Sequence, residues 1–450
     1  MNLHQAIDEY HALLTDERAA ESQAQLDEQL RRRGLFFGER PLCTVLRPRF
    51  MTPEQYAFLR RRIAVVLRAF DRAYHAAMEN AGFRAQFGLL EWEEELVGSD
   101  PGFTDPSPVS RLDAFFVSEQ GGLRFTEYNA ETPAGAAYGD LLGEVFLSLP
   151  VMRDFLRHYE VRPQPARHNV LHALISAYHE WAGRRATPRI AILDWREVPT
   201  WSEFEITAEF FRSQGIECII ADPRETELRE GKLFAGDFAI DLIYKRVLIT
   251  ELVEREGLDH PVVRAVRDGA VCMVNPFRCK ILHKKASLAV LSDENNAHLF
   301  TAEEREAIRM HIPWTRRVEE RKAEYHGDTV DLLPWMAENR EQLVLKPNDD
   351  YGGAGIVLGW EASAEEWERA IRFALSEPHI VQERIGLPHE TYPSVVNGRV
   401  HLGERMLDTA PFCFHGAYMD GAMTRLSTDA LLNVTAGGGS SVPTFVLERR

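Results

Sequence analysis

Oxygen-bearing side chains gather in two neighbouring segments, RLDAFFV (111–117) and LRFTEYNAETP (123–133). Each segment is typical of a β-strand, and Glu127 and Asn129, two positions apart, share one face of the second strand. Together with Asp113 they supply two carboxylates and an amide carbonyl, a donor set that suits Mg²⁺ better than zinc or copper. Glu127 and Asn129 also fit a turn or a helix cap, so the residues alone leave both interpretations open.

A glycine-rich loop follows a strand in LVLKPNDDYGGAGIVL (343–358). Glycines let backbone N–H groups approach phosphate oxygens, and Lys346 at the strand end adds positive potential. A plain β-turn at the Asp-Tyr-Gly-Gly stretch explains the same residues. A third segment, HIVQERI (379–385), ends an apolar strand with Gln382 and Glu383, whose side chains suit an adenine edge and a ribose hydroxyl; exposed Gln-Glu pairs are also common.

Lysine is scarce in this chain, so each lysine carries more information than usual. Lysines and arginines together number 52. The lysines among them are Lys232, Lys245, Lys280, Lys284, Lys285, Lys322 and Lys346. A lysine ammonium is a compact point charge that the flat guanidinium of arginine does not reproduce. A solvated surface position remains the ordinary alternative for any one of them.

Bulk composition narrows the class of protein. The formal net charge of −17 argues against nucleic-acid binding and against binding to anionic membranes. The five cysteines form no C-x-x-C pair, which suits reduced thiols in the cytoplasm. The first residues lack the apolar core of a secretory signal, and no apolar run is long enough to span a membrane. A length of 450 residues predicts about two to three domains in a cytoplasmic protein.

Several elements must position these side chains. Residues 1–95 are predicted to be mainly helical, with one helix starting at Thr52-Pro53. The alternating pattern of 165–275 predicts a small, mainly parallel sheet with flanking helices. The other predicted helices are 141–146, 284–291, 301–325 and 363–375, and residues 391–448 are expected to be rich in β-strands.

The order of these segments resembles the synthetase domain of glutathionylspermidine synthases and related circularly permuted ATP-grasp ligases. The matching stretches are Arg-Leu-Asp (111–113), EYNAETP (127–133), NPFRCKILHKKASLAVLSDE (275–294), the Lys-Pro loop with its glycines, and IVQERIGLP (380–388). The resemblance covers residues 105–450 at the level of motifs. It departs where the family has Gly-Arg-Glu-Gly and this chain has Asn-Asp-Asp-Tyr-Gly (348–352), and where His283-Lys284 precedes Lys285 in place of Ser-Asn.

The resemblance implies a role for each matching residue. Arg111 would hold the transferring phosphoryl group and the acyl oxyanion, and Asp113, Glu127 and Asn129 would bind Mg²⁺. The residues that it implies for ATP are Lys285, Lys346, Asp350, Gly352, Gly353, Gly355, Gln382, Glu383 and Arg425, with Lys284 able to share the role of Lys285.

The resemblance also implies an α/β (α+β) fold of the ATP-grasp type. Residues 1–164 would hold a helical region and the metal-binding strands, 165–275 a preATP-grasp, Rossmann-like substrate domain, and 276–450 the nucleotide-binding domain. The implied activity is that of an ATP- and Mg²⁺-dependent ligase, which joins a small-molecule or peptide carboxylate to an amine through an acyl phosphate. The alternatives are a nucleotide-binding pseudoenzyme or regulatory module, and a kinase that stops at phosphoryl transfer.

Overall fold

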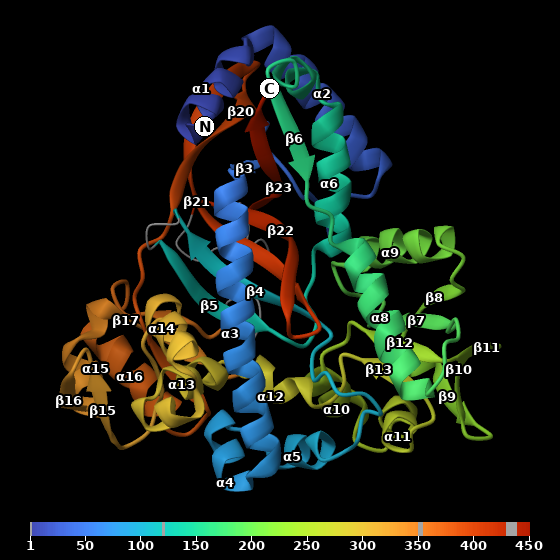
Figure 1. The fold of residues 1–450 in the computed structure, drawn as a ribbon, viewed down its shortest axis with the longest axis vertical. Helices are drawn as coiled ribbons and strands as arrows, with labels where there is room; N and C mark the ends of the chain where they lie inside the picture. The colour runs from blue at the N-terminus through green and yellow to red at the C-terminus, as the bar shows by residue number, and fades with distance from the viewer. Residues whose placement is uncertain (1, 119–121, 350–353, 429–438) are drawn as a thin grey trace.

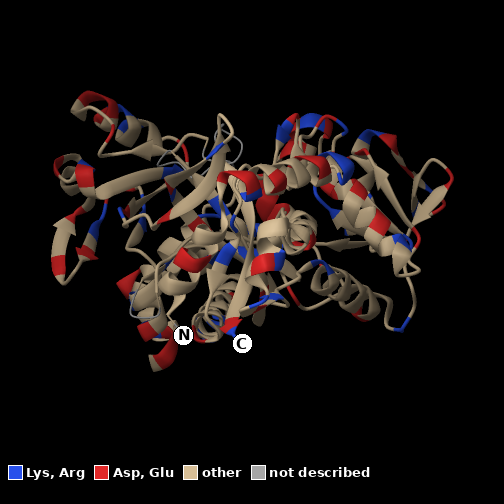
Figure 2. Ribbon diagram, turned by 90° about the horizontal axis from the view of Figure 1, so that it is seen from above, with Lys and Arg blue, Asp and Glu red and all other residues tan. Residues whose placement is uncertain are grey.

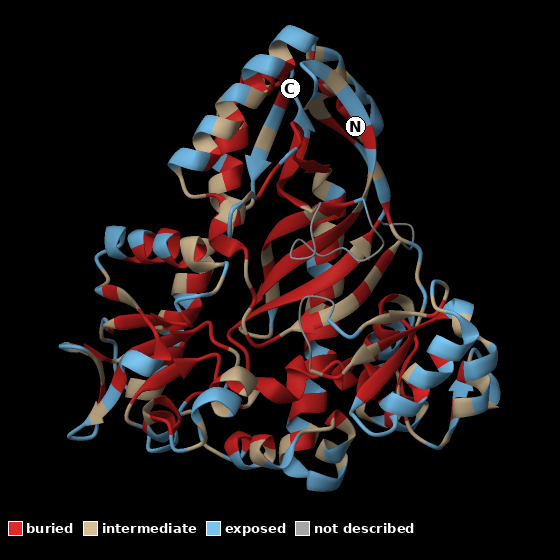
Figure 3. Ribbon diagram, turned by 180° about the vertical axis from the view of Figure 1, so that it is seen from behind, coloured by how far each residue is buried: buried red, intermediate tan, exposed pale blue. Residues whose placement is uncertain are grey.

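The computed structural model describes residues 2–118, 122–349, 354–428 and 439–450. The described residues form six sheets, of which the three largest have eight, four and four strands, and the two chain ends lie near each other at one end of the molecule (Figure 1). Buried residues concentrate in the large central sheet and in the parallel sheet beside it (Figure 3). Basic and acidic positions are mixed over the ribbon (Figure 2).

The central sheet has eight strands and carries five of the predicted site residues, Arg111, Asp113, Glu127, Asn129 and Arg425. Its main path runs β3-β23-β22-β21-β4-β5, with β20 paired to β21 and β6 paired to β23. All pairs are antiparallel except β23 with β3. The strands are β3 (Arg49–Met51), β4 (Val109–Phe116), β5 (Leu123–Asn129), β6 (Tyr159–Pro163), β20 (His389–Val396), β21 (Arg399–Phe414), β22 (Tyr418–Ser427) and β23 (Ser440–Arg449). The predicted β-rich C-terminal stretch is thereby confirmed.

Helix α3 (Pro53–Glu79) packs across this sheet and buries a long apolar stripe against it (Figure 1). The Thr52 hydroxyl accepts from the Gln55 N–H, and the Gln55 side-chain oxygen accepts from the Thr52 N–H, so the two residues form a capping box. This cap confirms the predicted helix start. The other α-helices of residues 3–155 and 279–311 are α1 (Leu3–Leu13), α2 (Asp16–Arg32), α4 (Ala81–Arg84), α5 (Glu91–Val97), α6 (Ala136–Ser148), α7 (Pro150–Phe155), α12 (Cys279–His283), α13 (Ala286–Ser292) and α14 (Ala302–His311).

The second sheet confirms the predicted parallel arrangement. Its order is β13-β12-β7-β8, with every pair parallel. Helices and a three-stranded antiparallel sheet, β11-β10-β9, accompany it. These elements are β7 (Ile190–Leu193), β8 (Cys218–Ala221), β9 (Thr226–Arg229), β10 (Lys232–Ala235), β11 (Phe238–Ile240), β12 (Leu242–Lys245), β13 (Cys272–Val274), α8 (Arg167–Ala182), α9 (Trp201–Ser213), α10 (Ile249–Glu256) and α11 (Pro261–Arg267).

The third sheet has the order β14-β19-β17-β18, and its strand β14 lies within a segment for which a helix was predicted. The helix expected over 301–325 ends at His311, and the strand β14 (Thr315–Arg317) follows. Pro313 explains the stop, because proline disfavours helical backbone at the residue before it. The remaining elements here are β15 (Lys322–Tyr325), β16 (Asp328–Asp331), β17 (Leu343–Pro347), β18 (Val357–Leu358), β19 (His379–Glu383), α15 (Leu332–Glu338) and α16 (Ala364–Ala374).

Candidate active site

The antiparallel pairing of β4 with β5 places the predicted metal-binding residues opposite one another. Arg111 pairs with Asn129 and Asp113 pairs with Glu127, and the register shifts immediately after Asp113. Asp113 is 2% exposed. The sequence signal of alternating polar residues in the two strands therefore corresponds to one polar patch at this edge of the sheet.

Asp113 lies at the centre of this patch. Arg111 donates to both of its oxygens, at 2.7 Å from Nε and 3.0 Å from Nη2. Arg425 of β22 donates at 2.7 Å, and the Asn129 amide at 3.0 Å. Burial opposes the charge, but the two arginines outweigh it and lower the pKa of Asp113 to about 2. Asp113 is thus an anion at neutral pH, and Arg425 is held between it and Asp408.

Two lysines face the same patch from other elements. The ammonium of Lys285, just before α13, lies 2.9 Å from a Glu127 oxygen. Lys346, at the end of β17, donates to Gln382 Oε1 at 2.7 Å and to the Thr126 carbonyl at 3.3 Å. Both of these described partners are neutral oxygens. Burial lowers the pKa of Lys346 to about 8, with Lys285 adding to the effect and Glu127 opposing it.

Asn348 explains how the two lysines come together. Its carbonyl accepts from the Lys285 backbone N–H at 2.9 Å, and its side-chain oxygen accepts from the Ala286 N–H at 2.8 Å. Its amide donates to the Phe87 carbonyl at 2.9 Å. The residue after the Lys-Pro pair therefore fixes the end of β17 to the start of α13, so that both ammonium groups reach β5.

The structure brings eight predicted site residues together and places others elsewhere. Those that converge are Arg111, Asp113, Glu127, Asn129, Lys285, Lys346, Gln382 and Arg425. Glu383 follows Gln382 on β19, so its side chain leaves the other face of the strand; it accepts from the Trp314 N–H at 2.9 Å and lies 3.3 Å from a His326 nitrogen. Gly355 lies in the turn before β18 with a φ of 69°. Asp350, Gly352 and Gly353 lie outside the described residues.

The donor chemistry of the patch fits Mg²⁺ and a phosphate group. Asp113 and Glu127 are carboxylates whose pKa values are lowered by Arg111 and Arg425 and by Lys285, so a metal ion would share their oxygens with these cations. Asn129 uses its amide N–H on Asp113, which leaves its carbonyl oxygen for a cation. The Lys346 ammonium donates to two neutral oxygens among the described residues, so it is suited to binding an anion such as a phosphate group. The arrangement is suited to holding a phosphate group between a metal ion and lysines.

A second charged cluster, buried except for the partly exposed Asp349, lies next to this patch. Glu131, two residues after β5, lies 3.2 Å from the Lys245 ammonium at the end of β12 and 3.3 Å from that of Lys280 in α12. It also accepts from the Ile249 N–H at 2.6 Å. Lys280 in turn contacts both oxygens of Asp349 at 2.7 Å. The cluster ties the parallel sheet to the loop that follows β17.

Lys284 and Glu93 complete the cluster. Lys284 lies 2.8 Å from Glu93 and 2.9 Å from Asp349. Ligand atoms of Glu131, His283 and Asp349 approach within 4.8 Å of one another, which is close enough for a metal ion. Lys245, Lys280 and Lys284 already contact the oxygens of Glu131 and Asp349 and neutralise these two acids. We therefore interpret this cluster as an ion-pair network that supports the site.

Sequence reasoning missed Glu131, Lys245, Lys280 and Asp349 as neighbours of the site. Glu131 stands within EYNAETP and Asp349 within the glycine-rich segment, both of which the sequence had marked. The scarcity of lysine was a usable signal for the other two. Lys245 is 1% and Lys280 2% exposed, although lysine is rarely buried unless it is paired.

The comparisons with known proteins give a fold and distant relatives. No family model matches the chain. An uncharacterized protein of Mycobacterium tuberculosis strain H37Rv is 25% identical over 350 residues, 74% of this chain and 59% of that protein. A putative glutamate–cysteine ligase of Frankia alni is 23% identical over 465 residues, 94% of this chain and 49% of that protein. The chain thus spans about half to three fifths of the length of these relatives.

A solved structure agrees over nearly the whole chain. A glutathione synthetase-like effector of Globodera pallida, in its apo form, superposes with a TM-score of 0.61, covering 95% of this chain and 96% of that chain at 13% identity. At this identity the likeness shows the fold alone: a mixed α/β arrangement similar to that of this glutathione synthetase-like effector. None of the helices in the described ranges combines the length and the apolar character that crossing a membrane requires.

Proposed function

We propose that the chain is an ATP- and Mg²⁺-dependent ligase that joins a carboxylate to an amine through an acyl phosphate. One observation carries the proposal: Lys285 and Lys346 meet Asp113 and Glu127 in one patch, and the described hydrogen bonds of Lys346 go to neutral oxygens. A partly buried cation with neutral partners costs free energy that a bound anion would offset. A nucleotide triphosphate supplies that anion.

Each side chain has a defined role in this reaction. Lys346 and Lys285 bind phosphate oxygens, and Arg111 holds the phosphoryl group while the substrate carboxylate attacks it. Mg²⁺ held by Asp113, Glu127 and Asn129 would neutralise phosphate charge. The amine then attacks the acyl carbon and phosphate leaves. Positioning and electrostatic stabilisation provide most of the acceleration in such transfers.

The remaining parts of the chain are assigned around this site. Residues 276–450 carry the nucleotide-binding half, and the parallel sheet within 165–275 carries the substrate half of a cytoplasmic enzyme. The name of the Frankia relative, a putative glutamate–cysteine ligase, and the glutathione synthetase-like description of the structural neighbour both support a ligase. The substrates are a small-molecule or peptide carboxylate and an amine.

The test measures ADP release in the presence of Mg²⁺, ATP and a panel of carboxylates, with hydroxylamine added to trap the acyl phosphate as a hydroxamate. We expect carboxylate-dependent ADP release and hydroxamate formation. Lys346→Met should lower kcat by about 10²–10³-fold, the loss typical of removing one group that stabilises developing charge. Lys322→Met, which changes an exposed lysine, is the matched control.

Two outcomes would contradict the proposal. Nucleotide binding without turnover for any carboxylate would indicate a binding module. A stable phosphorylated product that hydroxylamine does not trap would indicate a kinase.

A further inference from the structure

The two carboxylates proposed as metal ligands already hold cations of the chain itself. Asp113 accepts from Arg111 at 2.7 and 3.0 Å and from Arg425 at 2.7 Å. Glu127 lies 2.9 Å from the Lys285 ammonium. A metal ion that enters this patch therefore meets paired charges, and it must compete with the groups that pair them.

The charges of the patch favour a negatively charged ligand over a free cation. Among its described side chains, three carboxylates face four basic groups, namely Asp113, Glu127 and Asp408 against Arg111, Arg425, Lys285 and Lys346. A free divalent ion would add to this positive excess. A complex of Mg²⁺ with ATP carries a net negative charge and would offset it.

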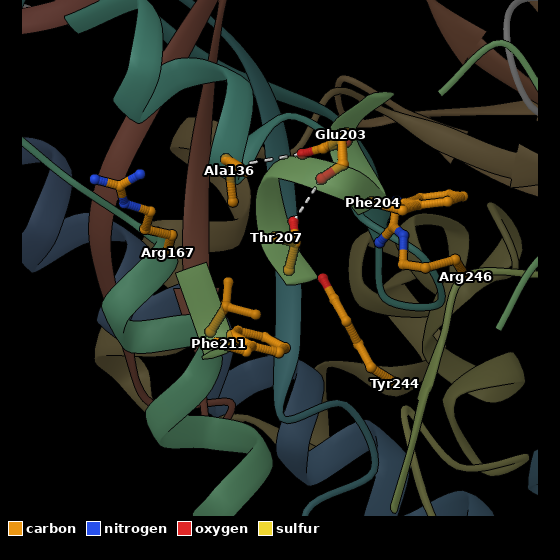
Figure 4. A pocket seen from close by; sticks show the side chains of 10 residues that line it. Ala136, Arg167, Glu203, Phe204, Thr207, Phe211, Tyr244 and Arg246 are labelled. Atoms are coloured by element: carbon orange, nitrogen blue, oxygen red, sulfur yellow. Dashed lines mark hydrogen bonds between the residues drawn. The ribbon is translucent and has the colours of Figure 1, made fainter. Parts of the chain in front are cut away.

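Arg111 is held from its far side, so it is not the cation that gives way. It donates to the Ala134 carbonyl at 2.7 Å, and the next backbone N–H, that of Gly135, donates to Glu203 at 2.7 Å. Figure 4 shows the small pocket that Glu203 and Thr207 of α9 line, where the Thr207 hydroxyl donates to the Glu203 carbonyl at 2.7 Å. The loop that anchors the arginine is thus itself bound to a helix.

Lys285 is the cation that can exchange its partner. Arg425 stays anchored by Asp408, to which its Nε donates at 2.9 Å. Lys285 is fixed by its backbone, because its N–H donates to the Asn348 carbonyl at 2.9 Å. Its ammonium has three donors on a flexible stem, so it can turn from a carboxylate to a phosphate oxygen while the backbone stays in place.

A free metal ion lacks the means to release this lysine. A phosphate group gives the ammonium a new anionic partner and leaves Glu127 for the metal, whereas a free ion offers the ammonium nothing in return. An ion on the second oxygen of Glu127 would still share one carboxylate with the ammonium, so repulsion opposes that arrangement as well.

We propose that Lys285 makes the site select the complex of Mg²⁺ with ATP over free Mg²⁺, because it holds Glu127 until a phosphate group takes over its ammonium. This inference rests on the proposed ligase function, since it names the form in which metal and nucleotide enter that site. Lys285 then acts twice: it excludes the free metal ion, and it binds the nucleotide.

The first experiment titrates the full chain with Mn²⁺ in the absence of nucleotide, and the electron paramagnetic resonance signal of the free ion reports binding. Mn²⁺ suits the same carboxylate and carbonyl oxygens as Mg²⁺. We expect Lys285→Met to bind Mn²⁺ at least about tenfold more tightly than the wild type, since hydrogen bonds to charged groups are the strong ones. Unchanged or weaker binding by Lys285→Met would overturn the inference.

Lys346→Met is the matched control. It removes the same charge from the same patch, but the described partners of Lys346 are neutral oxygens, so its Mn²⁺ affinity should rise less than that of Lys285→Met. Lys285→Arg keeps a cation beside Glu127 and should bind Mn²⁺ as weakly as the wild type. Adding Glu127→Gln to Lys285→Met should abolish the gain. An equal gain in both methionine variants, or a gain that survives Glu127→Gln, would overturn the role of Lys285.

Nucleotide binding should change in the opposite direction. Calorimetry with ATP in excess Mg²⁺ should show at least about tenfold weaker binding by Lys285→Met, because the ammonium that takes a phosphate oxygen is gone. A folding defect would weaken the binding of metal and nucleotide alike, so a gain of one with a loss of the other isolates the exchange. Nucleotide binding by Lys285→Met at the wild-type level would contradict it.

Hydroxamate formation separates this inference from the proposed function. A wild type that forms the hydroxamate, with no gain of Mn²⁺ binding in Lys285→Met, refutes the inference and leaves the ligase function standing. The two opposite changes in Lys285→Met, with no hydroxamate from the wild type, support the inference and refute the ligase function. A wild type that binds no ATP even with Mg²⁺ refutes both.

Discussion

Removing the Glu131 carboxylate should change the pH dependence of stability. Glu131 is fully buried, and Lys245 and Lys280 lie 3.2 and 3.3 Å from its oxygens. Burial opposes its charge, but the two lysines outweigh burial and lower its pKa from 4.5 to about 2. Because one pKa unit corresponds to about 1.4 kcal/mol, this shift contributes about 3 kcal/mol to folding at neutral pH.

The sign follows from the lowered pKa. Above pH 4.5, the pKa of the group in the unfolded chain, the contribution of Glu131 to stability is fully present. It is lost as the pH falls towards about 2, the pKa of the group in the folded protein. By linkage, the wild type should lose about 2 kcal/mol through this group between about pH 7 and about pH 3. Glu131→Gln has no such group. At neutral pH this variant should unfold about 3–5 kcal/mol more easily, because Lys245 is left buried without its carboxylate.

The assay is urea unfolding of the wild type and of Glu131→Gln at neutral and acid pH. The stability gap between the two should narrow by about 2 kcal/mol on acidification, since all other titrating groups are common to both proteins. Glu341→Gln, at an exposed acid, should show no gap at either pH. Lys245→Met should cost less than Glu131→Gln, because Glu131 keeps Lys280 and the Ile249 N–H. A gap that stays constant from neutral to acid pH would refute the assignment of the charge to Glu131.

Three further outcomes follow from the geometry. The ATP affinity of the wild type should weaken as the pH rises through about 8, because Lys346 loses its proton there. Lys346→Met should bind ATP weakly at every pH. Calorimetry measures both affinities, and a parallel decline with pH in the two proteins would contradict the role of Lys346 in phosphate binding. Arg425→Leu should lose turnover and about 3–5 kcal/mol of stability, because Asp408 and Asp113 lose a shared cation in the interior; an unchanged urea midpoint would be inconsistent with this. Trp367→Ala should cost about 3–5 kcal/mol in urea unfolding, as expected for truncating a fully buried aromatic residue, and Glu341→Gln again serves as the unaffected reference.

Much of the fold followed from local patterns in the sequence. The cap at Thr52, the strands that carry Asp113 and Glu127, and the parallel sheet all depend on signals that a few adjacent residues carry. The helix predicted over 301–325 was too long. The charge pattern of the whole segment resembles a helix surface, but the helix ends at His311, before Pro313, and a strand follows. The β9–β11 meander, residues 226–240, was missed because its strands have only three or four residues each.

Only part of the site could be predicted from the sequence. Residues that stand in motifs could be identified, whereas ion pairs depend on distances in the folded chain that the sequence does not show. Asp113, Lys285 and Lys346 stand in segments with a recognisable pattern, and the structure places them together. The partners of Glu131 are 114 and 149 positions away in the sequence, and no local pattern joins them.

The distribution of lysines connects these observations physically. Lys245, Lys280, Lys284 and Lys285 are buried, Lys346 is partly buried, and Lys232 and Lys322 are exposed. A chain that uses arginine for most of its basic residues keeps lysine where space is limited to one small ammonium with rotatable donors. Lys280 illustrates this: its ammonium contacts Asp349, Glu131 and the Thr250 hydroxyl within 3.3 Å, three directions that a planar guanidinium does not serve from one atom. The same compactness lets Lys285 reach Glu127 and Lys346 reach the Thr126 carbonyl, so that both ammonium groups lie at β5, where the proposed phosphate site needs them.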